Sequence, residues 1–472
     1  MQKNRLFSFI GILVLLGGLF SCGGSDDKTI VFWHTSGAGI ASGYEEAANN
    51  FAALVKENEG VDITIKPSYQ GGYSDILDKV TKSLATGTGP TIAIAYPDHV
   101  ANYISAENGV SEKYVVNMKT LADDAAVGFG KESWIGDNDS SDFITNFYDE
   151  GQDYANEGMY SLPLMKSTEV MYYNKDIVLQ YASGFDASLN SEAAVDSWLA
   201  GVSWDDFISF ATYIRNHWTN GGKAGYFPIW YDSDSNLFIS QAYQRNIPYI
   251  SKKTDGTMSV DFKNDQSKAL LTELKALHTD GILTTKGCEG TYGSSNFIES
   301  KCIFCIGSSG GAGYQDPSEA GFNYGISEVP YANNNKLYIT QGPTLTLLKN
   351  TGSSDEVNDF KIKYAWKFIK YLTSTNVNMN LCVTDSQGYI PVRQSSYDTD
   401  DYVQYLKEDT IYSKTAQVVI NDIQGHYLIS PSIKGSAEAR DAVGGLVTQV
   451  LLANQTIDDA LTYYANQAVL GS

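Results

Sequence analysis

Residues 29–33 read TIVFW, and the strand and helix patterns that continue from this segment decide the fold. Over residues 44–55, apolar side chains recur at helical spacing, which predicts a helix with one buried face. Residues 61–65 then alternate between apolar and polar, as in a strand with one covered face. A second helical pattern over 73–84 and an apolar strand over 91–95 complete the series. Consecutive strand, helix and strand units predict a parallel sheet with right-handed crossovers, and hence the α/β class.

The chain opens with the features of an export signal. Two basic residues precede an apolar stretch over 6–20, which is shorter than the ~20 residues that a membrane span needs. Cys22 follows, with small and polar residues after it, and this resembles the lipobox of a bacterial lipoprotein, although Phe20 stands where a small residue is usual. We therefore expect residues 1–22 to be a lipoprotein signal peptide that ends at a lipidated Cys22. A plain signal peptide and an uncleaved anchor are the alternatives. A diacylated cysteine would tether the protein to the outer face of the membrane.

Length, composition and charge limit the possible classes of protein. About 450 residues remain after the signal, which is too many for one hydrophobic core, so two domains are expected. Apolar residues make up 43% and charged residues 19% of the chain, as is ordinary for a folded protein. The formal net charge is -22, from 33 basic and 55 acidic residues, and the sequence has no long basic run. Because a phosphate backbone requires clustered lysine and arginine, no nucleic acid is expected as a partner.

Four cysteines follow Cys22, at positions 288, 302, 305 and 382. Residues 302–306 have the pattern of an apolar strand, on which positions three apart face opposite sides. Cys302 and Cys305 are therefore not expected to bond to each other. We expect buried thiols, and a disulfide between Cys288 and either Cys302 or Cys305 is the alternative to test.

No motif for a metal or another cofactor stands out. The five histidines are scattered without a close pair, so a zinc site is not expected. Residues 137–142, DNDSSD, resemble the start of a calcium-binding loop. However, Asp142 stands at the sixth position, where glycine is needed, and Tyr148 at the twelfth, where glutamate is needed. We expect a solvated acidic loop there, with no metal and no cofactor.

Five sequence blocks follow one another in a recognisable order. They are Ile30–His34, Tyr172–Asp176, Tyr364–Leu372, Gly388–Val392 and Thr456–Leu461. Each block is common alone, but in this order they resemble the extracellular solute-binding proteins of family 1, the receptor component of bacterial ABC importers. The resemblance spans essentially the whole processed chain. Within the family it is closest to glycerol-3-phosphate-binding and oligosaccharide-binding members.

The resemblance implies a two-lobed α/β fold of the periplasmic-binding-protein class II, with the ligand cleft between the lobes. Three crossings would join the lobes, near Lys166–Glu169, near Gly342 and near Gly388–Pro391. The N-terminal lobe would comprise residues 28–166 and 343–388, and the C-terminal lobe residues 167–342 and 389–472. Each lobe would be discontinuous in sequence, so deletion of the C-terminal third should damage both.

The resemblance also implies ligand contacts, position by position. A tyrosine after a glycine turn matches Tyr73, an acid beyond the third strand matches Asp98, and a cleft tryptophan matches Trp230. The remaining matches lie at the crossings and in the second lobe: Ser167, next to Thr168, then Ser308, Ser309, Gly342 and Tyr389.

One position departs from the pattern of the glycerol-3-phosphate relatives. Ser432 stands where those relatives hold the phosphate with an arginine, and a hydroxyl suits a phosphate less well than a bidentate guanidinium. Lys434 is close enough in sequence to substitute. We therefore favour an uncharged carbohydrate over a sugar phosphate or a glycerophosphodiester. The 32 Tyr, 19 Phe and 7 Trp residues offer flat faces for sugar rings, although most aromatic side chains fill cores.

The implied function is that of a substrate-binding lipoprotein of an ABC importer. It would capture an uncharged sugar or oligosaccharide outside the cytoplasmic membrane, on the periplasmic side if an outer membrane is present. As a monomer, it would deliver this ligand to the permease subunits. A receptor for glycerol-3-phosphate or a glycerophosphodiester is the first alternative.

Two alternatives belong to other functional classes. An exported glycoside hydrolase would also be acidic and aromatic-rich, with two carboxylates beside the scissile bond. No such pair stands out among the 55 acidic residues, and no Gly-x-Ser-x-Gly elbow is present, so we do not expect an enzyme. The other alternative is a surface adhesin that uses the same fold, and such a protein would ignore the sugar.

Overall fold

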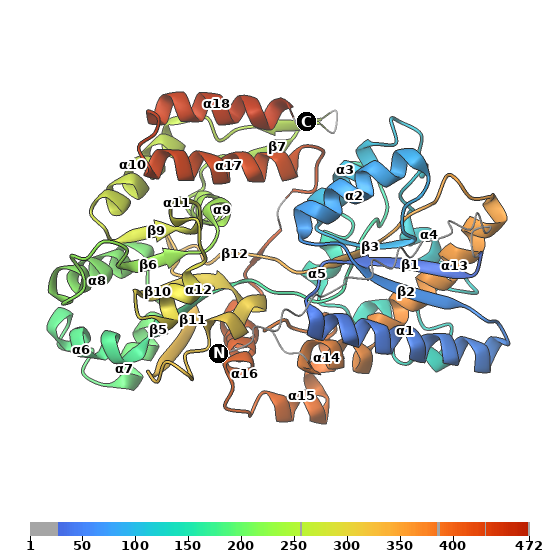
Figure 1. Cartoon of the computed structure of the whole chain (residues 1–472), viewed down its shortest axis with the longest axis horizontal. Helices are drawn as coiled ribbons and strands as arrows, with labels where there is room; N and C mark the ends of the chain where they lie inside the picture. Colours follow the sequence, from blue (N-terminus) through green and yellow to red (C-terminus); the bar gives the residue numbers. More distant parts are fainter. Residues whose placement is uncertain (1–26, 255–256, 385–387, 430, 471–472) are drawn as a thin grey trace, which may run out of the picture.

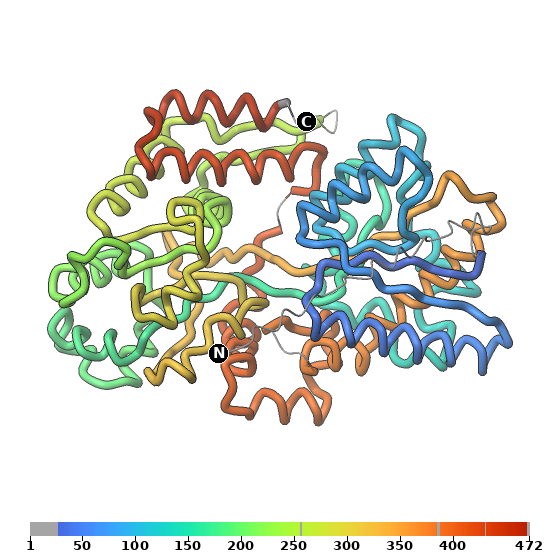
Figure 2. The backbone as a smooth tube through the Cα atoms, in the orientation of Figure 1, coloured from blue at the N-terminus to red at the C-terminus, as the bar shows by residue number. Residues whose placement is uncertain are grey.

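The computed structural model describes residues 27–254, 257–384, 388–429 and 431–470 (Figure 1). The predicted signal peptide and Cys22 lie outside the described residues. Two bodies, each built around one sheet, lie side by side, and the backbone trace in Figure 2 passes between them more than twice. Within the described ranges, no helix combines the length and the apolar character that a membrane span requires.

The first lobe surrounds a five-stranded sheet with the order β2-β1-β3-β13-β4. Its strands are β1 (Thr29–His34), β2 (Thr64–Tyr69), β3 (Ile92–Ala95), β13 (Thr344–Leu347) and β4 (Leu162–Pro163). β1 pairs in parallel with β2 and β3, which confirms the predicted arrangement, although β2 begins at Thr64 and not at residue 61. β13 joins antiparallel to both β3 and β4, so the complete sheet is mixed.

Helices cover both faces of this sheet, because its strands carry buried side chains on both faces. On one face Phe32 packs against Tyr44 of α1 (Ala38–Glu59) and Phe368 of α13 (Asp355–Leu372). On the other, Ala93 and Ala95 join the apolar side chains of α2 (Tyr73–Thr86) and α3 (Pro97–Ser105). The other elements on this side of the molecule are α4 (Met118–Ala122), η1 (Ser133–Ile135), η2 (Ser140–Asp142), α5 (Thr145–Glu150), α14 (Thr375–Thr384), η4 (Gln394–Asp398) and α15 (Asp400–Tyr405).

The second lobe surrounds a sheet with the order β11-β5-β10-β6-β9. Its strands are β11 (Tyr324–Glu328), β5 (Glu169–Asn174), β10 (Cys302–Ser308), β6 (Phe227–Tyr231) and β9 (Leu283–Thr285). Its helices are α6 (Lys175–Phe185), α7 (Glu192–Leu199), α8 (Trp204–His217), α9 (Asp234–Gln244), α10 (Asp265–Thr279), α11 (Lys286–Glu289), α12 (Gly293–Ile298), α16 (Ile411–Val418), α17 (Ser436–Leu451) and α18 (Ile457–Leu470). Short elements complete it: β7 (Ile250–Lys252), β8 (Met258–Val260), η3 (Ser309–Gln315), β12 (Tyr338–Ile339), η5 (Val419–Ile423) and β14 (Tyr427–Leu428).

The cysteines of the described residues are all free thiols. Cys302, Cys305 and Cys382 are buried, and Cys288 is partly buried. The buried-thiol expectation therefore holds for three of them, and the alternative disulfide of Cys288 is not formed.

Three chain segments run together where the lobes meet, and they hydrogen-bond to one another. The backbone amide and carbonyl of Ser167 pair with those of Gln341 at 3.0 and 2.8 Å. Lys166 pairs in the same way with Ile390, at 3.1 and 2.8 Å. These three segments, around residues 166–167, Gln341 and Ile390, form a narrow ribbon that is here called the hinge ribbon. They lie close to the positions expected for the crossings. Residues beyond Tyr389 still contact the first lobe, since Phe143 bridges to Arg393, so the lobe limits given above stay a prediction.

A buried ion pair braces this ribbon. The ammonium of Lys166 contacts the carboxylate of Glu150, and both side chains are almost fully buried. Thr340, from the second crossing, donates its hydroxyl to the same carboxylate at 3.0 Å. Two of the three crossings therefore converge on one acidic side chain.

Candidate ligand site

Three tyrosines form a surface at the edge of the first lobe, here called the tyrosine shelf (Tyr73, Tyr96 and Tyr389). The rings of Tyr73 and Tyr96 stack with centroids 3.8 Å apart and an interplanar angle of 11°. Tyr73 is the first residue of α2, and Tyr96 is the N-cap of α3, directly after β3. Both rings therefore lie where strands of the sheet end, which is the usual place for ligands in α/β folds.

Tyr389 extends the shelf from the third crossing. Burial raises the pKa of the Tyr73 hydroxyl, and the neighbouring Tyr96 and Tyr389 raise it further. Burial also raises the pKa of Tyr389 to about 12. A Cβ atom added at Gly310 would lie 2.7 Å from the Tyr389 ring, so only glycine leaves room for it. The shelf thereby reaches the second lobe.

A pocket of about 650 Å³ adjoins the shelf on the side of the second lobe, and it is here called the cleft pocket. Two of its tyrosines are unusually exposed for aromatic residues, Tyr292 at 54% and Tyr314 at 70%. Gln341 of the hinge ribbon also lines it. The complete lining comprises Glu169, Asp232, Ser233, Asn236, Lys286, Thr291, Tyr292, Ser294, Ser295, Ser308, Gly311, Tyr314, Gln315 and Gln341.

Glu169 supplies a buried carboxylate to this pocket. It accepts hydrogen bonds from the Tyr231 hydroxyl at 2.6 Å and from the Asn236 amide at 2.8 Å. Arg440 in turn donates to the Asn236 oxygen, which fixes the orientation of that amide. Burial raises the pKa of Glu169 to about 7, although both of these hydrogen bonds oppose the rise. The carboxylate is therefore oriented and only partly neutralised, and it keeps lone pairs for a ligand.

Asp232 supplies a second carboxylate, directly after β6. It accepts a hydrogen bond from the backbone amide of Gly293 at 2.6 Å. Burial raises its pKa to about 6. Lys286 also lines the pocket, and its ammonium lies 3.8 Å from the centre of the Tyr292 ring. The described lining thus holds two carboxylates and one cation. This charge balance suits a ligand that donates hydrogen bonds better than an anionic ligand.

The structure brings most of the expected contact residues together at the hinge side of this site. Ser309 exchanges hydrogen bonds with Thr168, since its backbone amide donates at 2.7 Å and its hydroxyl accepts at 3.2 Å. Ser308 lines the cleft pocket. Ser167 and Gly342 meet in the hinge ribbon, and Tyr73 and Tyr389 form the shelf. Whether these residues touch a ligand stays a prediction.

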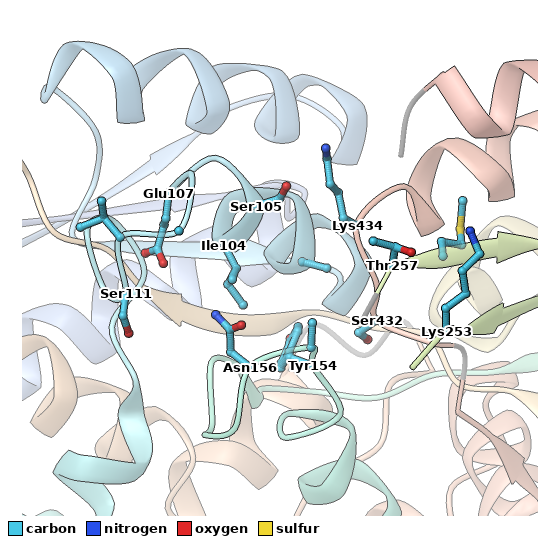
Figure 3. A pocket seen from close by; sticks show the side chains of 15 residues that line it. Ile104, Ser105, Glu107, Ser111, Tyr154, Asn156, Lys253, Thr257, Ser432 and Lys434 are labelled. Carbon is cyan, nitrogen blue, oxygen red and sulfur yellow. The ribbon is translucent and has the colours of Figure 1, made fainter. Parts of the chain in front are cut away.

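Asp98, Trp230 and Lys434 do not line the cleft pocket, although Asp98 lies close enough to Tyr96 of the shelf to raise the pKa of its hydroxyl. Asp98 is in the first turn of α3 and accepts a hydrogen bond from the backbone of His99. Trp230 is only 2% exposed, and its ring fills the space that Gly293 leaves free, away from the pocket lining. Lys434 lines a different pocket of about 690 Å³, here called the seam pocket, together with Ser432 and Tyr154 (Figure 3).

Several residues of the site escaped the sequence interpretation. They are Tyr96, Glu169, Asp232, Asn236, Lys286, Tyr292 and Tyr314. The segment after β6, which reads Asp232-Ser233-Asp234, carried a usable signal, because polar residues that follow a buried strand mark a sheet edge. Tyr292 and Tyr314 carried none, since they lie outside any apolar period.

Among the residues that the structure describes, no three side chains of His, Cys, Asp or Glu are grouped as metal ligands. In the acidic loop over 137–142, Asp142 accepts hydrogen bonds from the backbone and hydroxyl of Ser395, and it lies 3.6 Å from Arg393. This part of the loop is therefore held by protein groups and is less solvated than expected.

Comparison with known proteins gives one family and several related structures. The family model described as bacterial extracellular solute-binding protein matches residues 46–408. The sn-glycerol-3-phosphate-binding periplasmic protein UgpB of Escherichia coli (strain K12) is 24% identical over 377 residues, which cover 78% of this chain and 75% of UgpB.

Solved structures agree on the fold. The ABC substrate-binding protein Lmo0181 from Listeria monocytogenes, in complex with cycloalternan, superposes with a TM-score of 0.69 at 17% identity, over 93% of this chain and 97% of that one. UgpB from Mycobacterium tuberculosis, in complex with glycerophosphocholine, gives a TM-score of 0.68 at 15% identity, over 94% and 98%. These likenesses confirm the expected two-lobed α/β fold.

Proposed function

Because the chain belongs to the bacterial extracellular solute-binding proteins, a family of receptors rather than enzymes, we propose that it captures an uncharged carbohydrate for an ABC importer. The ligand is a sugar or oligosaccharide that lies between the tyrosine shelf and the cleft pocket. The receptor is held at the membrane through a lipid on Cys22 and hands the ligand to permease subunits.

The observation that supports this ligand class is the pairing of exposed tyrosine rings with buried carboxylates in the cleft pocket. Tyr292 and Tyr314 offer flat faces for the C–H surfaces of sugar rings. Glu169 and Asp232 offer desolvated acceptors for hydroxyl groups, and a charge-assisted hydrogen bond is about twice as strong as a neutral one. The volume of about 650 Å³ falls within the usual range for a small-molecule ligand.

A glycerol phosphate is the second candidate, because the curated relatives are described as glycerol-3-phosphate-binding. Of the described residues that line the cleft pocket, Lys286 is the one cation that could meet its phosphate. Two carboxylates in the same lining oppose an anion, and Ser432 and Lys434 line the seam pocket instead. The charge balance of the cleft pocket therefore favours the neutral ligand.

Capture follows from the position of the site between two lobes. A ligand that contacts the shelf on one side and the cleft pocket on the other binds the closed form more tightly than the open form. The difference between the two affinities then shifts the lobes toward closure. The hinge ribbon keeps its hydrogen bonds between three antiparallel segments, so the lobes can turn about it as rigid bodies.

A calorimetric screen of neutral mono- and oligosaccharides against sn-glycerol 3-phosphate tests the proposal. We expect a neutral saccharide to bind and to be recovered unchanged. Tyr314→Ala and Glu169→Gln should each weaken its affinity by about tenfold or more, which corresponds to the loss of one ring contact or one charge-assisted hydrogen bond. Tyr463→Ala is the matched control, since Tyr463 is also an exposed tyrosine, at 50% against 70% for Tyr314, and lies on α18. Preferential binding of glycerol phosphate, or cleavage of the saccharide, contradicts the proposal.

The pH dependence of affinity distinguishes the two ligand classes independently. Glu169 has a pKa of about 7 and Asp232 of about 6, so both carboxyls take up protons as the pH falls through these values. A hydroxyl that donates to a carboxylate favours the ionised form, and affinity for a neutral sugar should therefore fall on acidification. Affinity for a phosphate should rise instead, because the opposing negative charge disappears. Binding titrations from about pH 5 to about pH 8 show whether affinity falls or rises on acidification. Glu169→Gln should flatten the affinity curve near neutral pH.

A further inference from the structure

A second contact joins the lobes at a distance from the hinge, and one side chain of α3 makes it. The Asn102 amide nitrogen donates to Glu438 Oε1 at 3.0 Å. The Asn102 amide oxygen accepts from the backbone amide of Gly435 at 3.3 Å. Gly435 is the N-cap of α17, and Glu438 lies in its first turn. One neutral side chain of the first lobe thus clasps the start of a helix that packs against α9 and α18 of the second lobe.

The groups around this clasp are mostly acidic, so the contact depends on the neutral amide. Burial raises the pKa of Glu438, and the nearby Asp98 and Asp441 raise it further, while the hydrogen bond from Asn102 lowers it. The other charged or titratable neighbours are His99, on α3, Arg440, on α17, and Lys434, directly before Gly435. Glu438 Oε2 is buried and has no hydrogen-bond partner within the described residues. A carboxylate in such surroundings needs a donor, and Asn102 is the donor that the other lobe supplies.

The seam pocket lies next to this clasp, with walls from both lobes. Ile104 and Ser105 of α3 face it from one side, and Lys253 and Thr257 from the other (Figure 3). A second interlobe hydrogen bond lies at the same pocket, where the Lys252 ammonium donates to the carbonyl of Tyr154 at 2.8 Å. Residues next to both contacts line the pocket, so opening of the lobes would have to break the clasp and widen this space.

We propose that Asn102 is an interlobe latch, whose amide holds α3 to the first turn of α17 in the closed form and so sets ligand affinity without touching the ligand. The part that concerns affinity rests on the proposed function. The latch itself does not, because the closed and open forms differ in shape whatever the ligand is. Loss of one hydrogen bond to a charged group should shift the equilibrium about tenfold toward the open form.

Small-angle X-ray scattering of the purified, processed protein tests the latch without any ligand. Asn102→Ala should increase the radius of gyration at neutral pH. Glu438→Gln is the matched control: it removes the charge but keeps an oxygen that accepts from Asn102, and it should stay as compact as the wild type. An unchanged radius of gyration for Asn102→Ala overturns the proposal. Opening of Glu438→Gln to the same extent also overturns it, because the charge and not the amide would then hold the contact.

Asn102→Asp provides a second test that does not depend on the folding of the alanine variant. It differs from asparagine by one atom but places a carboxylate against Glu438 and near Asp98 and Asp441. We expect this variant to be open at about pH 8 and compact at about pH 5, where protonation relieves the repulsion and restores a donor. A compact form at both pH values overturns the latch. Failure to bind saccharide by a variant with normal scattering would bear only on the proposed function.

Discussion

Replacement of Lys166 by methionine is expected to lower the free energy of unfolding by about 3–5 kcal/mol. Lys166 is 1% exposed, and its ammonium is paired with the carboxylate of Glu150, which is 6% exposed. Methionine fills a similar volume but leaves the carboxylate buried without its cation. Among the described residues, the only other side-chain donor to Glu150 is the Thr340 hydroxyl, which is neutral. Because the pair lies in the hinge ribbon, the loss should loosen both lobes. Denaturant unfolding followed by circular dichroism measures it.

Two further variants show whether the buried charge is the cause. Lys56→Met removes a lysine whose pair with Asp62 is exposed on both sides, and it should change stability by less than about 1 kcal/mol. The double variant Lys166→Met/Glu150→Leu removes both charges and should recover much of the loss, because no unpaired charge remains. Equal stabilities of Lys166→Met and Lys56→Met would show that the hinge pair does not brace the fold.

Gly342→Ala is expected to be the most disruptive single methyl addition at the hinge, with a loss of about 3 kcal/mol or more, or a failure to fold. Gly342 has a φ of 104°, a backbone angle that residues with a side chain rarely adopt. An added Cβ would also lie 2.4 Å from the carbonyl oxygen of Met165 and 2.9 Å from the Cα of Lys166. These are backbone atoms of the neighbouring crossing, so they cannot move aside without parting the ribbon.

Two glycines of the same chain separate backbone strain from the steric clash. Gly60 has a φ of 69° but no atom near an added Cβ, so Gly60→Ala should cost only about 1 kcal/mol. Gly37 has a φ of -63° and also no close atom, so Gly37→Ala should be neutral or slightly stabilising. Thermal unfolding of the three variants should rank them with Gly342→Ala lowest. A Gly342→Ala variant as stable as Gly60→Ala would show that the backbone of the hinge ribbon can shift to make room for the added methyl group.

The first half of the fold follows from local patterns. Apolar residues at helical spacing placed α1, since Tyr44 and Phe51 face the sheet and the others follow its period. The alternation around Ile63 predicted a strand but not its first residue, because Val61 and Ile63 extend the apolar pattern before Thr64 without pairing to β1. The antiparallel strand β13 could not be deduced from pattern alone, since its partner β3 lies far away in the sequence.

The site was harder to predict than the fold. The resemblance selected Tyr73, Tyr389 and Ser308, which the structure places near one another, because crossings and sheet edges have fixed places in a two-lobed protein. It did not indicate Tyr314, which lies in the 3-10 helix η3 directly after β10. Trp230 shows the opposite limitation: a large aromatic residue on a central strand alternates between faces, and here it points into the core beside Gly293. Loop geometry and the face of a strand are tertiary properties that spacing does not encode.

The mixed sheet of the first lobe also determines when this protein can fold during its synthesis. β3 ends at Ala95, but the strand that covers its free edge, β13, does not begin until Thr344. A nascent chain that has left the ribosome only as far as residue 340 therefore exposes an unpaired β3 edge and lacks α13 as well. Non-local pairing of this kind is slow to form. The first lobe therefore cannot complete its sheet until most of the chain has been made.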